Sequence, residues 1–216
     1  MDSETKATIR KEVGGAPPDL TRTPFVVEEE LVLARRMDEE EKKQVISRSI
    51  RGIPDFPKPG ILFWDITTLM LDVDAFRHCI DLFAQRYRPH GIHAVAGLEA
   101  RGLMFGAPLA IALGCGFVPI RKPNKLPGET VGQAYDLEYG TDRVEMHVDA
   151  IQPGQKVLLV DDLIATGGTM AAGIRLLERV GAVVHECACV IELPELKGRE
   201  KLQGKPLYVL IEKEGL

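Results

Sequence analysis

The sequence predicts an α/β fold: a single domain with a mostly parallel, twisted sheet flanked by helices. Three observations support this fold class. Short apolar runs rich in β-branched residues alternate with amphipathic segments of helical spacing, the order typical of βαβ units. The 216 residues are 45% hydrophobic and 27% charged, enough for one sizeable core. Twenty-one glycines and 14 prolines, with only 6% aromatic residues, indicate many tight turns between regular elements.

Residues 1–37 differ in composition from the rest of the chain. They are polar, are interrupted by prolines and carry acidic runs such as Glu28–Glu30. Organellar transit peptides are rich in Ser and Arg and poor in acids, so this stretch does not match one. We expect a flexible N-terminal extension over residues 1–37 and a folded domain over residues 38–216.

Hydrophobic periodicity places the elements of the domain in order. Apolar residues at helical spacing predict helices from about residue 39 to the turn at Ile53–Pro57, and near residues 76–87, 102–113 and 170–180. Short apolar runs predict strands near residues 93–97, 117–120, 156–160, 183–191 and 207–211. Ligands of parallel sheets bind at the carboxyl ends of the strands, and this directs the search for a site.

Charge and the length of apolar runs exclude several classes of protein. The formal net charge of −5 argues against a general nucleic-acid binder, which usually carries a basic face. The longest apolar runs are far below the roughly 20 residues that a membrane helix needs, so we expect no transmembrane segment and no membrane partner. The four cysteines form no CxxC pair and no disulfide framework, which indicates a reducing, cytoplasmic setting.

Two of the cysteines, Cys187 and Cys189, lie two apart in a strand-like run. Their side chains should therefore share one face of the sheet and suit apolar packing there. Metal binding is the alternative for this pair. No HExxH motif or other dense ligand cluster supports a transition-metal site.

The most informative segment runs from Val157 to Thr169. A buried strand delivers Asp161 and Asp162 to its carboxyl end, and a short loop with paired glycines then opens a helix. Ionised carboxylates only accept hydrogen bonds, which suits the hydroxyls of a sugar. The loop suits a phosphate, because glycine lets backbone N–H groups approach closely and a helix N-terminus attracts anions. The loop residues are Ala165, Thr166, Gly167, Gly168 and Thr169.

This pattern predicts a site for a phosphorylated ribose. The alternative is a plain strand ending in acids before a turn. Other nucleotide motifs are absent from the sequence: no GxxxxGK[ST] occurs, and Gly114-Cys115-Gly116 has Pro119 where a dinucleotide fingerprint needs a small residue.

The Val157–Thr169 segment resembles the phosphoribosyl pyrophosphate signature of the type I phosphoribosyltransferase family. Further motifs resemble the adenine-specific branch of that family: Pro54-Asp55-Phe56-Pro57, Gly97-Leu98-Glu99-Ala100-Arg101-Gly102, Arg121-Lys122-Pro123, Leu137-Glu138-Tyr139-Gly140 and Glu195-Leu196-Lys197-Gly198-Arg199-Glu200. The resemblance implies the family fold, with a small hood and a mobile catalytic loop. It also implies transfer of 5-phosphoribosyl from phosphoribosyl pyrophosphate to adenine, giving AMP and pyrophosphate in purine salvage.

The resemblance assigns the leaving pyrophosphate to two basic regions. Its expected contacts are Glu99, Ala100, Arg101, Arg121, Lys122 and Lys125. It also implies a cis peptide between Glu99 and Ala100, and Arg101 as a catalytic residue. A guanidinium just before a helix can grip phosphate oxygens, although a surface salt bridge is the alternative for Arg101. Taken alone, the basic loop would more often be a solvated face.

The catalytic carboxylate implied by the resemblance is Glu138. A base near the purine imidazole can accept the proton lost as the glycosidic bond forms. Tyr139 would lie beside it in a mobile lid from about Lys125 to Tyr139 that excludes water. Simple packing is the alternative for Tyr139.

Adenine is expected under a hood formed by Leu62, Phe63 and Trp64. The resemblance implies main-chain recognition at Leu62 and Trp64, with an aromatic side chain at Phe63. Animal-type members carry a basic residue where this chain has Trp64, so a side-chain role there does not carry over. The alternative for both aromatic residues is the core of a short strand.

The resemblance also implies Mg²⁺ and a homodimer. Mg²⁺ would be held mainly by substrate phosphates and waters rather than by a protein cage. Two rival functions remain at this stage. One is a non-catalytic regulator of the same fold that senses purines or phosphoribosyl pyrophosphate, and the other is a transferase for another base such as a cytokinin.

Overall fold

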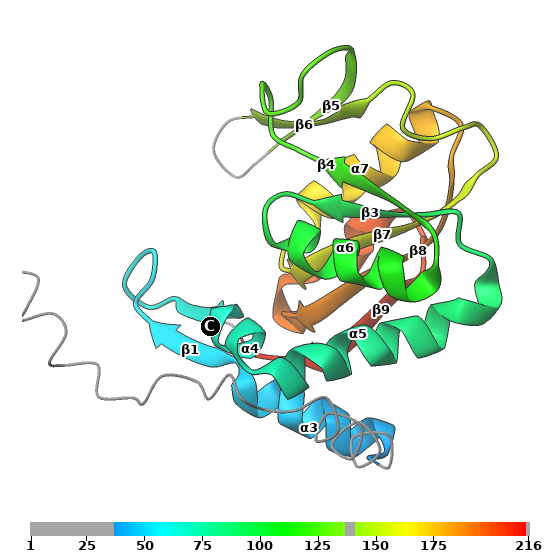
Figure 1. Ribbon diagram of the computed structural model, residues 1–216. Coiled ribbons are helices and arrows are strands. Elements are labelled where there is room, and N and C mark those ends of the chain that lie inside the picture. Colours follow the sequence, from blue (N-terminus) through cyan, green and yellow to red (C-terminus); the bar gives the residue numbers. More distant parts are fainter. Residues whose placement is uncertain (1–36, 137–140, 215–216) are drawn as a thin grey trace, which may run out of the picture. The chain divides into compact units, whose positions relative to one another are not determined.

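A five-stranded parallel sheet, in the order β4-β3-β7-β8-β9, organises the chain (Figure 1). The computed structural model describes residues 37–136 and 141–214. The strands of the sheet are β3 (Ala94–Leu98), β4 (Gly116–Ile120), β7 (Lys156–Ile164), β8 (Val183–Glu192) and β9 (Leu207–Glu212). All five predicted strands are therefore confirmed, and they form the mostly parallel sheet that the sequence indicates.

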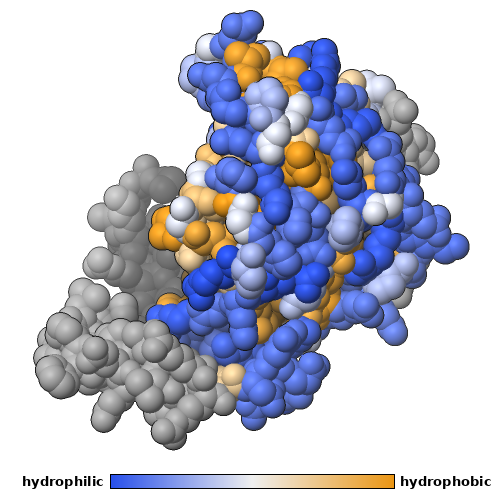
Figure 2. All heavy atoms as spheres, turned by 90° about the vertical axis from the view of Figure 1, so that its right-hand side faces the viewer, coloured by the Kyte–Doolittle hydropathy of each residue, from blue (hydrophilic) through white to orange (hydrophobic). Residues whose placement is uncertain are grey.

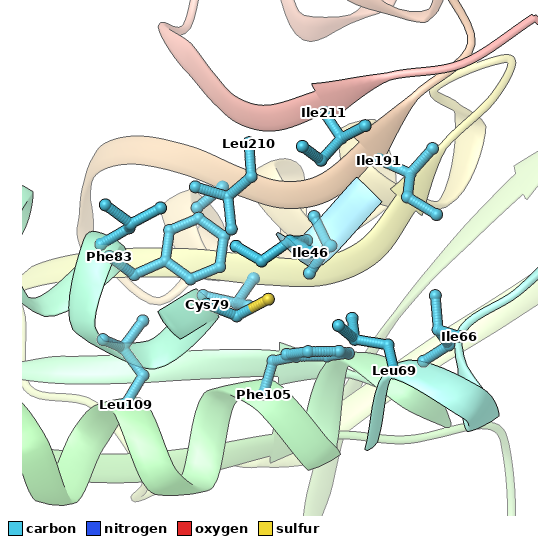
Figure 3. Close-up of a cluster of buried hydrophobic side chains, with 14 of the residues drawn as sticks. Ile46, Ile66, Leu69, Cys79, Phe83, Phe105, Leu109, Ile191, Leu210 and Ile211 are labelled. Atoms are coloured by element: carbon cyan, nitrogen blue, oxygen red, sulfur yellow. The ribbon is translucent and has the colours of Figure 1, made fainter. Parts of the chain in front are cut away.

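Helices cover both faces of this sheet, because each central strand is apolar on both sides. Leu158 and Val160 of β7 join one core, and Val157 and Leu159 join the other. The first core is shared with α3 (Glu39–Ser49), α4 (Thr67–Leu71), α5 (Val73–Tyr87) and α6 (Arg101–Leu113). Figure 3 shows side chains of this core converging between α5, α6 and the sheet. The second core lies under α7 (Gly168–Arg179).

Helix α3 begins where its sequence provides an N-terminal cap. The Asp38 carboxylate accepts a hydrogen bond from the Glu41 backbone N–H, and the Glu41 carboxylate accepts one from the Asp38 N–H. This capping box satisfies two donors that the first turn leaves without partners. Ile46, in the middle of the helix, is fully buried. The predicted helix near residue 39 is thus confirmed.

Two antiparallel hairpins form two-stranded sheets beside the main sheet, and the second is joined to it by a bridge between Glu145 and Arg121, the residue after β4 (Figure 1). The first pairs β1 (Arg51–Pro54) with β2 (Leu62–Asp65) and forms the hood. The second pairs β5 (Thr130–Asp136) with β6 (Thr141–His147) and packs beside α7. This second hairpin corrects the expectation of a loop from Lys125 to Tyr139, because residues 130–136 are a strand.

Strand β7 also runs further than its apolar residues indicate. Asp161 pairs with Cys189 of β8 and Leu163 pairs with Ile191, so the ladder continues to Ile164. The two acids therefore lie inside the strand rather than beyond its end. Their backbone is held by a neighbour on one side, which fixes the direction of both carboxylates.

Three of the connections contain short 3₁₀ helices: η1 (Arg88–His90), η2 (Pro194–Leu196) and η3 (Gly198–Leu202). All four cysteines are free thiols, and Cys187 and Cys189 are buried together in the α7-side core, as predicted. Within the described residues no helix is long and apolar enough to span a membrane. On the face drawn in Figure 2, apolar areas are interrupted by hydrophilic side chains, as is usual for a protein surface.

Candidate functional site

The strand order creates a crevice between β3 and β7. Strand β3 pairs with β4 on one side and with β7 on the other. Helix α6, which follows β3, packs on one face of the sheet, and α7, which follows β7, packs on the opposite face. The loops after the two strands therefore diverge. In open α/β sheets such a reversal of strand order is where ligands bind.

The loop after β7 encloses a pocket of about 120 Å³. It is lined by Asp161 and by the residues from Leu163 to Met170. Gly167 forms the N-cap of α7 with φ +75°, a left-handed conformation that glycine adopts without steric cost. The predicted phosphate-loop residues, from Ala165 to Thr169, are thus brought together around one small hollow at a helix N-terminus. This geometry suits a phosphate.

A second glycine holds this loop in place. A side chain at Gly167 would collide with the Gly198 carbonyl, and a side chain at Gly198 would collide with the Ala165 carbonyl. The adjoining Arg199 donates two hydrogen bonds to the buried carboxylate of Glu192, at 2.7 and 2.6 Å. Sequence reasoning assigned no role to Gly198. The signal for it in the sequence is the Lys197-Gly198-Arg199 part of the family motif.

Arg101 joins the two sides of the crevice. Its Nε lies 2.6 Å from Oδ2 of Asp162, whose side chain is 6% exposed. Burial raises the pKa of Asp162, although the Arg101 charge favours its ionised form. Burial also raises the pKa of Asp161, and the neighbouring Asp162 charge raises it further. The ion pair shows that Arg101 lies against the acid pair, in contact with Asp162. It also agrees with the salt-bridge alternative for Arg101.

Gly102 makes this approach possible. A Cβ there would lie 2.6 Å from the Val160 carbonyl oxygen and 3.0 Å from Oδ1 of Asp161. The first turn of α6 therefore packs directly on β7. A larger residue would push Arg101 away from the acids.

Glu99 lies on the other side of the crevice, and its carboxylate is hydrogen-bonded to the basic loop. The peptide between Glu99 and Ala100 is cis, as the resemblance implies. The carboxylate accepts hydrogen bonds from Nε of Arg121 at 2.8 Å and from the Lys122 backbone N–H at 2.7 Å. Hydrogen bonding by Arg121 lowers the pKa of Glu99. The Glu99 side chain thus orients Arg121. The Glu99 backbone N–H donates to the Ile120 carbonyl at 2.9 Å, so the predicted pyrophosphate contact at Glu99 has no free donor in this structure.

Lys122 is held by a network that sequence reasoning missed. Its ammonium donates to Asp142 and to the Tyr135 hydroxyl, and Tyr135 in turn donates to Asp142 at 3.0 Å. Burial disfavours the charged lysine, but the hydrogen bonds to Asp142 and Tyr135 outweigh burial and raise its pKa. Thr169 of the phosphate loop donates to the same Tyr135 hydroxyl at 3.3 Å. The network therefore links the basic segment to the phosphate loop.

The hood places its two aromatic residues on opposite faces, because neighbouring side chains in a strand alternate. The Phe63 ring lies 5.5 Å from the guanidinium carbon of Arg101, so it faces the crevice. Trp64 points the other way and donates from Nε1 to the Glu214 carbonyl at 2.8 Å. The side chain of Trp64 therefore takes no part in the crevice.

Three of the candidate residues are placed less fully. Lys125 is exposed in the turn before β5. Glu138 and Tyr139 lie outside the described residues. Their predicted roles as catalytic carboxylate and lid residue therefore remain predictions.

Comparisons with known proteins support the same chemistry. The family model "Phosphoribosyl transferase domain" matches residues 71–209. Adenine phosphoribosyltransferase 1 of Triticum aestivum is 65% identical over 167 residues, covering 77% of this chain and 92% of that protein. Adenine phosphoribosyltransferase of Shewanella loihica is 54% identical over 177 residues, covering 81% and 98%.

Solved structures agree in fold over the same part of the chain. The Saccharomyces cerevisiae adenine phosphoribosyltransferase, complexed with adenine and D-2,5-dideoxy-2,5-imino-altritol 1,6-bisphosphate, has a TM-score of 0.77 and 41% identity. The match covers 80% of this chain and 99% of that one. The enzyme from Thermoanaerobacter pseudethanolicus also has a TM-score of 0.77, with 48% identity and coverage of 79% and 99%.

Proposed function

The chain belongs to the phosphoribosyl transferase family, and on that premise we propose that it is an adenine phosphoribosyltransferase. It transfers the 5-phosphoribosyl group of phosphoribosyl pyrophosphate to adenine, giving AMP and pyrophosphate. The single observation that carries this proposal is the crevice itself. There the phosphate loop, the acid pair and Arg101 meet beside the hood.

Each part of the substrate has a matching part of the site. The 5′-phosphate fits the loop from Ala165 to Thr169, where backbone N–H groups and the start of α7 offer a positive potential. Asp161 and Asp162 accept hydrogen bonds from the ribose hydroxyls. Arg101 and Arg121 bind the pyrophosphate, with Lys122 and Lys125 adding charge. The main chain at Ala100 completes this contact, and Glu99 contributes by holding Arg121.

Adenine binds under the hood. The Phe63 ring, which faces Arg101, packs on the base, and the main chain at Leu62 and Trp64 recognises its edge. Pyrophosphate departs from C1′ while adenine attacks from the opposite face, with inversion at C1′. Glu138 accepts the proton that the base loses. Most of the rate enhancement comes from positioning and electrostatic stabilisation.

The donor set suits Mg²⁺ that is carried by the substrate. Asp162 is already paired with Arg101, and no group of three or more potential ligands is arranged for a metal among the described residues. Substrate phosphate oxygens and waters are the natural ligands. When bound, Mg²⁺ neutralises part of the pyrophosphate charge and so assists its departure.

Three further features belong to the proposal. Residues 38–216 carry the transferase domain and residues 1–37 are an extension. The enzyme is a homodimer, as the family resemblance suggests. It works in the cytoplasm, where the four free thiols would remain reduced.

The proposal is tested by incubating the protein with Mg²⁺, phosphoribosyl pyrophosphate and a panel of bases. We expect AMP to form from adenine faster than any nucleotide forms from another base. A faster product from a cytokinin would assign a different base. If no base gave a product, the remaining function would be that of a non-catalytic sensor of the same fold.

The role of Glu138 is tested by Glu138→Ala. Loss of a general base lowers rates by about 10²–10⁴-fold, so kcat should fall by that order while KM for phosphoribosyl pyrophosphate changes little. Glu129→Ala, at an exposed glutamate of the same segment, is the matched control. An unchanged kcat in Glu138→Ala would remove Glu138 from the mechanism.

A further inference from the structure

The indole of Trp64 lies between the hood and the C-terminal end of the described chain. Gly52, opposite Trp64 in the β1–β2 ladder, leaves room for it, since a Cβ at Gly52 would lie 3.3 Å from the indole ring. Nε1 of Trp64 donates to the Glu214 carbonyl at 2.8 Å. The ammonium of Lys213 lies 4.6 Å from the ring centroid. Two consecutive residues after β9 thus hold one aromatic side chain.

Lys213 is itself fixed from two other directions. Its ammonium donates to the Ser47 hydroxyl at 2.9 Å and to the Ser47 carbonyl at 3.2 Å, both near the end of α3. Its backbone N–H donates to the carbonyl of Glu192 at the end of β8 at 2.9 Å. Partial burial lowers the pKa of Lys213, which agrees with an ammonium enclosed by neighbours. The residue therefore ties the hood, α3 and the main sheet together.

Besides these polar contacts, Trp64 is partly buried against the first core. Within residues 37–136 and 141–214, strand β2 pairs with β1 alone, and the side chains of Leu62 and Trp64 alternate with those of Phe63 and Asp65. Phe63 and the main chain of β2 belong to the proposed base site. Any shift of the Trp64 indole would therefore be passed through one peptide unit to the groups that recognise the base.

We propose that Lys213 and the Glu214 carbonyl form a clamp on Trp64 that positions the hood for base binding. Trp64 and Lys213 are then positioning residues, which act on the base through the main chain of β2 and do not touch it. This inference rests on the proposed function, because it assigns the base subsite to the hood. It also gives a reason for Trp64 in this chain, which the family resemblance did not supply.

The test uses the full chain and the variants Lys213→Met and Lys213→Arg. Lys213→Met keeps the aliphatic stem and removes the cation. Loss of a hydrogen-bonded cation from such a partly buried contact should weaken the binding of adenine by about 10-fold, if the contact positions the hood. We expect KM for adenine to rise by about that factor, while kcat and KM for phosphoribosyl pyrophosphate stay within about 2-fold. Lys213→Arg should restore most of the loss. Lys201→Met, at an exposed lysine, is the matched control.

A second readout does not depend on activity. Trp64 is the single tryptophan of the chain, so its fluorescence reports the clamp directly. In Lys213→Met we expect a red-shifted emission and stronger quenching by acrylamide than in the Lys201→Met control, both measured well below the thermal midpoint of either variant. Adenine added to the unaltered protein should change the same emission.

The outcomes separate the clamp from the proposed function. Equal rises of both KM values, or an unchanged KM for adenine with unchanged quenching, would overturn the clamp even if AMP is formed. Failure of the unaltered protein to make AMP would overturn the proposed function. The quenching comparison would then still decide whether Lys213 holds Trp64.

Discussion

At the scale of single residues, the site depends on close approaches that only small side chains allow. Gly102 lets α6 reach the acids of β7, and Gly167 lets the phosphate loop rest on Gly198. Charged residues of the site also form ion pairs, Glu99 with Arg121 and Asp162 with Arg101. These contacts fix the donors and acceptors before a ligand arrives, which is how preorganised sites gain their effect.

Gly167→Ala should be more damaging than a glycine substitution with the same backbone angle in open space. Gly204 provides the comparison, since its φ is +77° and no atom lies within 4 Å of a Cβ built there. A left-handed alanine costs about 1–2 kcal/mol, so Gly204→Ala should lose roughly that much stability. Gly167→Ala should lose about 1–3 kcal/mol more because its methyl collides with Gly198.

Urea unfolding of the two variants gives the free energies, and steady-state kinetics gives KM for phosphoribosyl pyrophosphate. We expect KM to rise only for Gly167→Ala. Equal losses of stability in both variants would mean that the Gly167–Gly198 approach relaxes at no cost.

Asp65 predicts a specific acid sensitivity. Its carboxylate accepts hydrogen bonds from the Thr67 N–H at 2.9 Å, from Arg51 at 2.5 Å and from the Thr67 hydroxyl at 2.8 Å. The Thr67 N–H, followed by Arg51, lowers its pKa from 3.8 to about 2. Because the folded pKa is depressed, this stabilisation is present above about pH 4 and is lost as the pH falls towards 2. It amounts to about 2 kcal/mol.

Asp65→Asn should therefore lower the free energy of unfolding by up to about 2 kcal/mol at pH 7, and the gap should close near pH 2. Urea unfolding at a series of pH values measures this. Asp149→Asn, at an exposed aspartate, should show no such pattern. A gap of constant size from pH 7 to pH 2 would contradict the ionic origin of the effect.

At the scale of elements, short caps and ladders decide where each piece begins and what it carries. The α3 capping box starts the helix whose C-terminal end contacts Lys213. The β5–β6 register sets Tyr135 opposite Asp142, and this pair holds Lys122. Elements outside the main sheet therefore supply much of the positioning around the crevice.

Asp38→Ala tests the cap. Loss of an N-cap side chain costs about 1 kcal/mol, and because α3 packs on α5 the loss should appear in global unfolding. We expect a lower thermal midpoint with unchanged kinetics at 25 °C. Glu40→Ala, in the same turn but outside the capping box, should change the midpoint much less. Equal shifts in the two variants would show that the capping box contributes nothing beyond the local charge.

The sequence predicted the main sheet because its strands are buried on both faces and read as unbroken apolar runs. The β5–β6 hairpin escaped prediction because its strands are half exposed and mix Gln133, Arg143 and Glu145 with apolar residues. The phosphate loop and acid pair are contiguous in sequence and could be predicted. The Lys122–Asp142 contact could not, since it joins positions 20 residues apart through a register that only the fold defines.

At the scale of the whole molecule, two cores on opposite faces of one sheet hold the crevice between β3 and β7. The substrate contacts proposed above come from loops at the carboxyl ends of the strands of this sheet and from the hood. Residues 1–36 lie outside the described part of the chain, and no contact in the crevice that the structure describes requires them.

A chain that begins at Met37 tests the proposed extension. It keeps Asp38 and so keeps the α3 cap. We expect kcat and both KM values to stay within about 2-fold and the thermal midpoint to shift by less than about 2 °C. A chain that begins at Arg51 lacks α3 and its buried Ile46, and should be clearly less stable. Loss of activity in the chain that begins at Met37 would show that the extension contributes to catalysis.

The central pairing of the sheet also has a consequence for synthesis. Ala94 of β3 pairs with Val157 of β7, so the middle of the sheet joins segments about 60 residues apart. At about 5–20 residues per second, a ribosome takes about 3–12 s to add the second segment. For the later part of that time β3 and β4 are both finished, but one edge of β3 has no neighbour. An open edge of this kind is a template for wrong pairing, so the newborn chain is most exposed to aggregation until β7 has emerged.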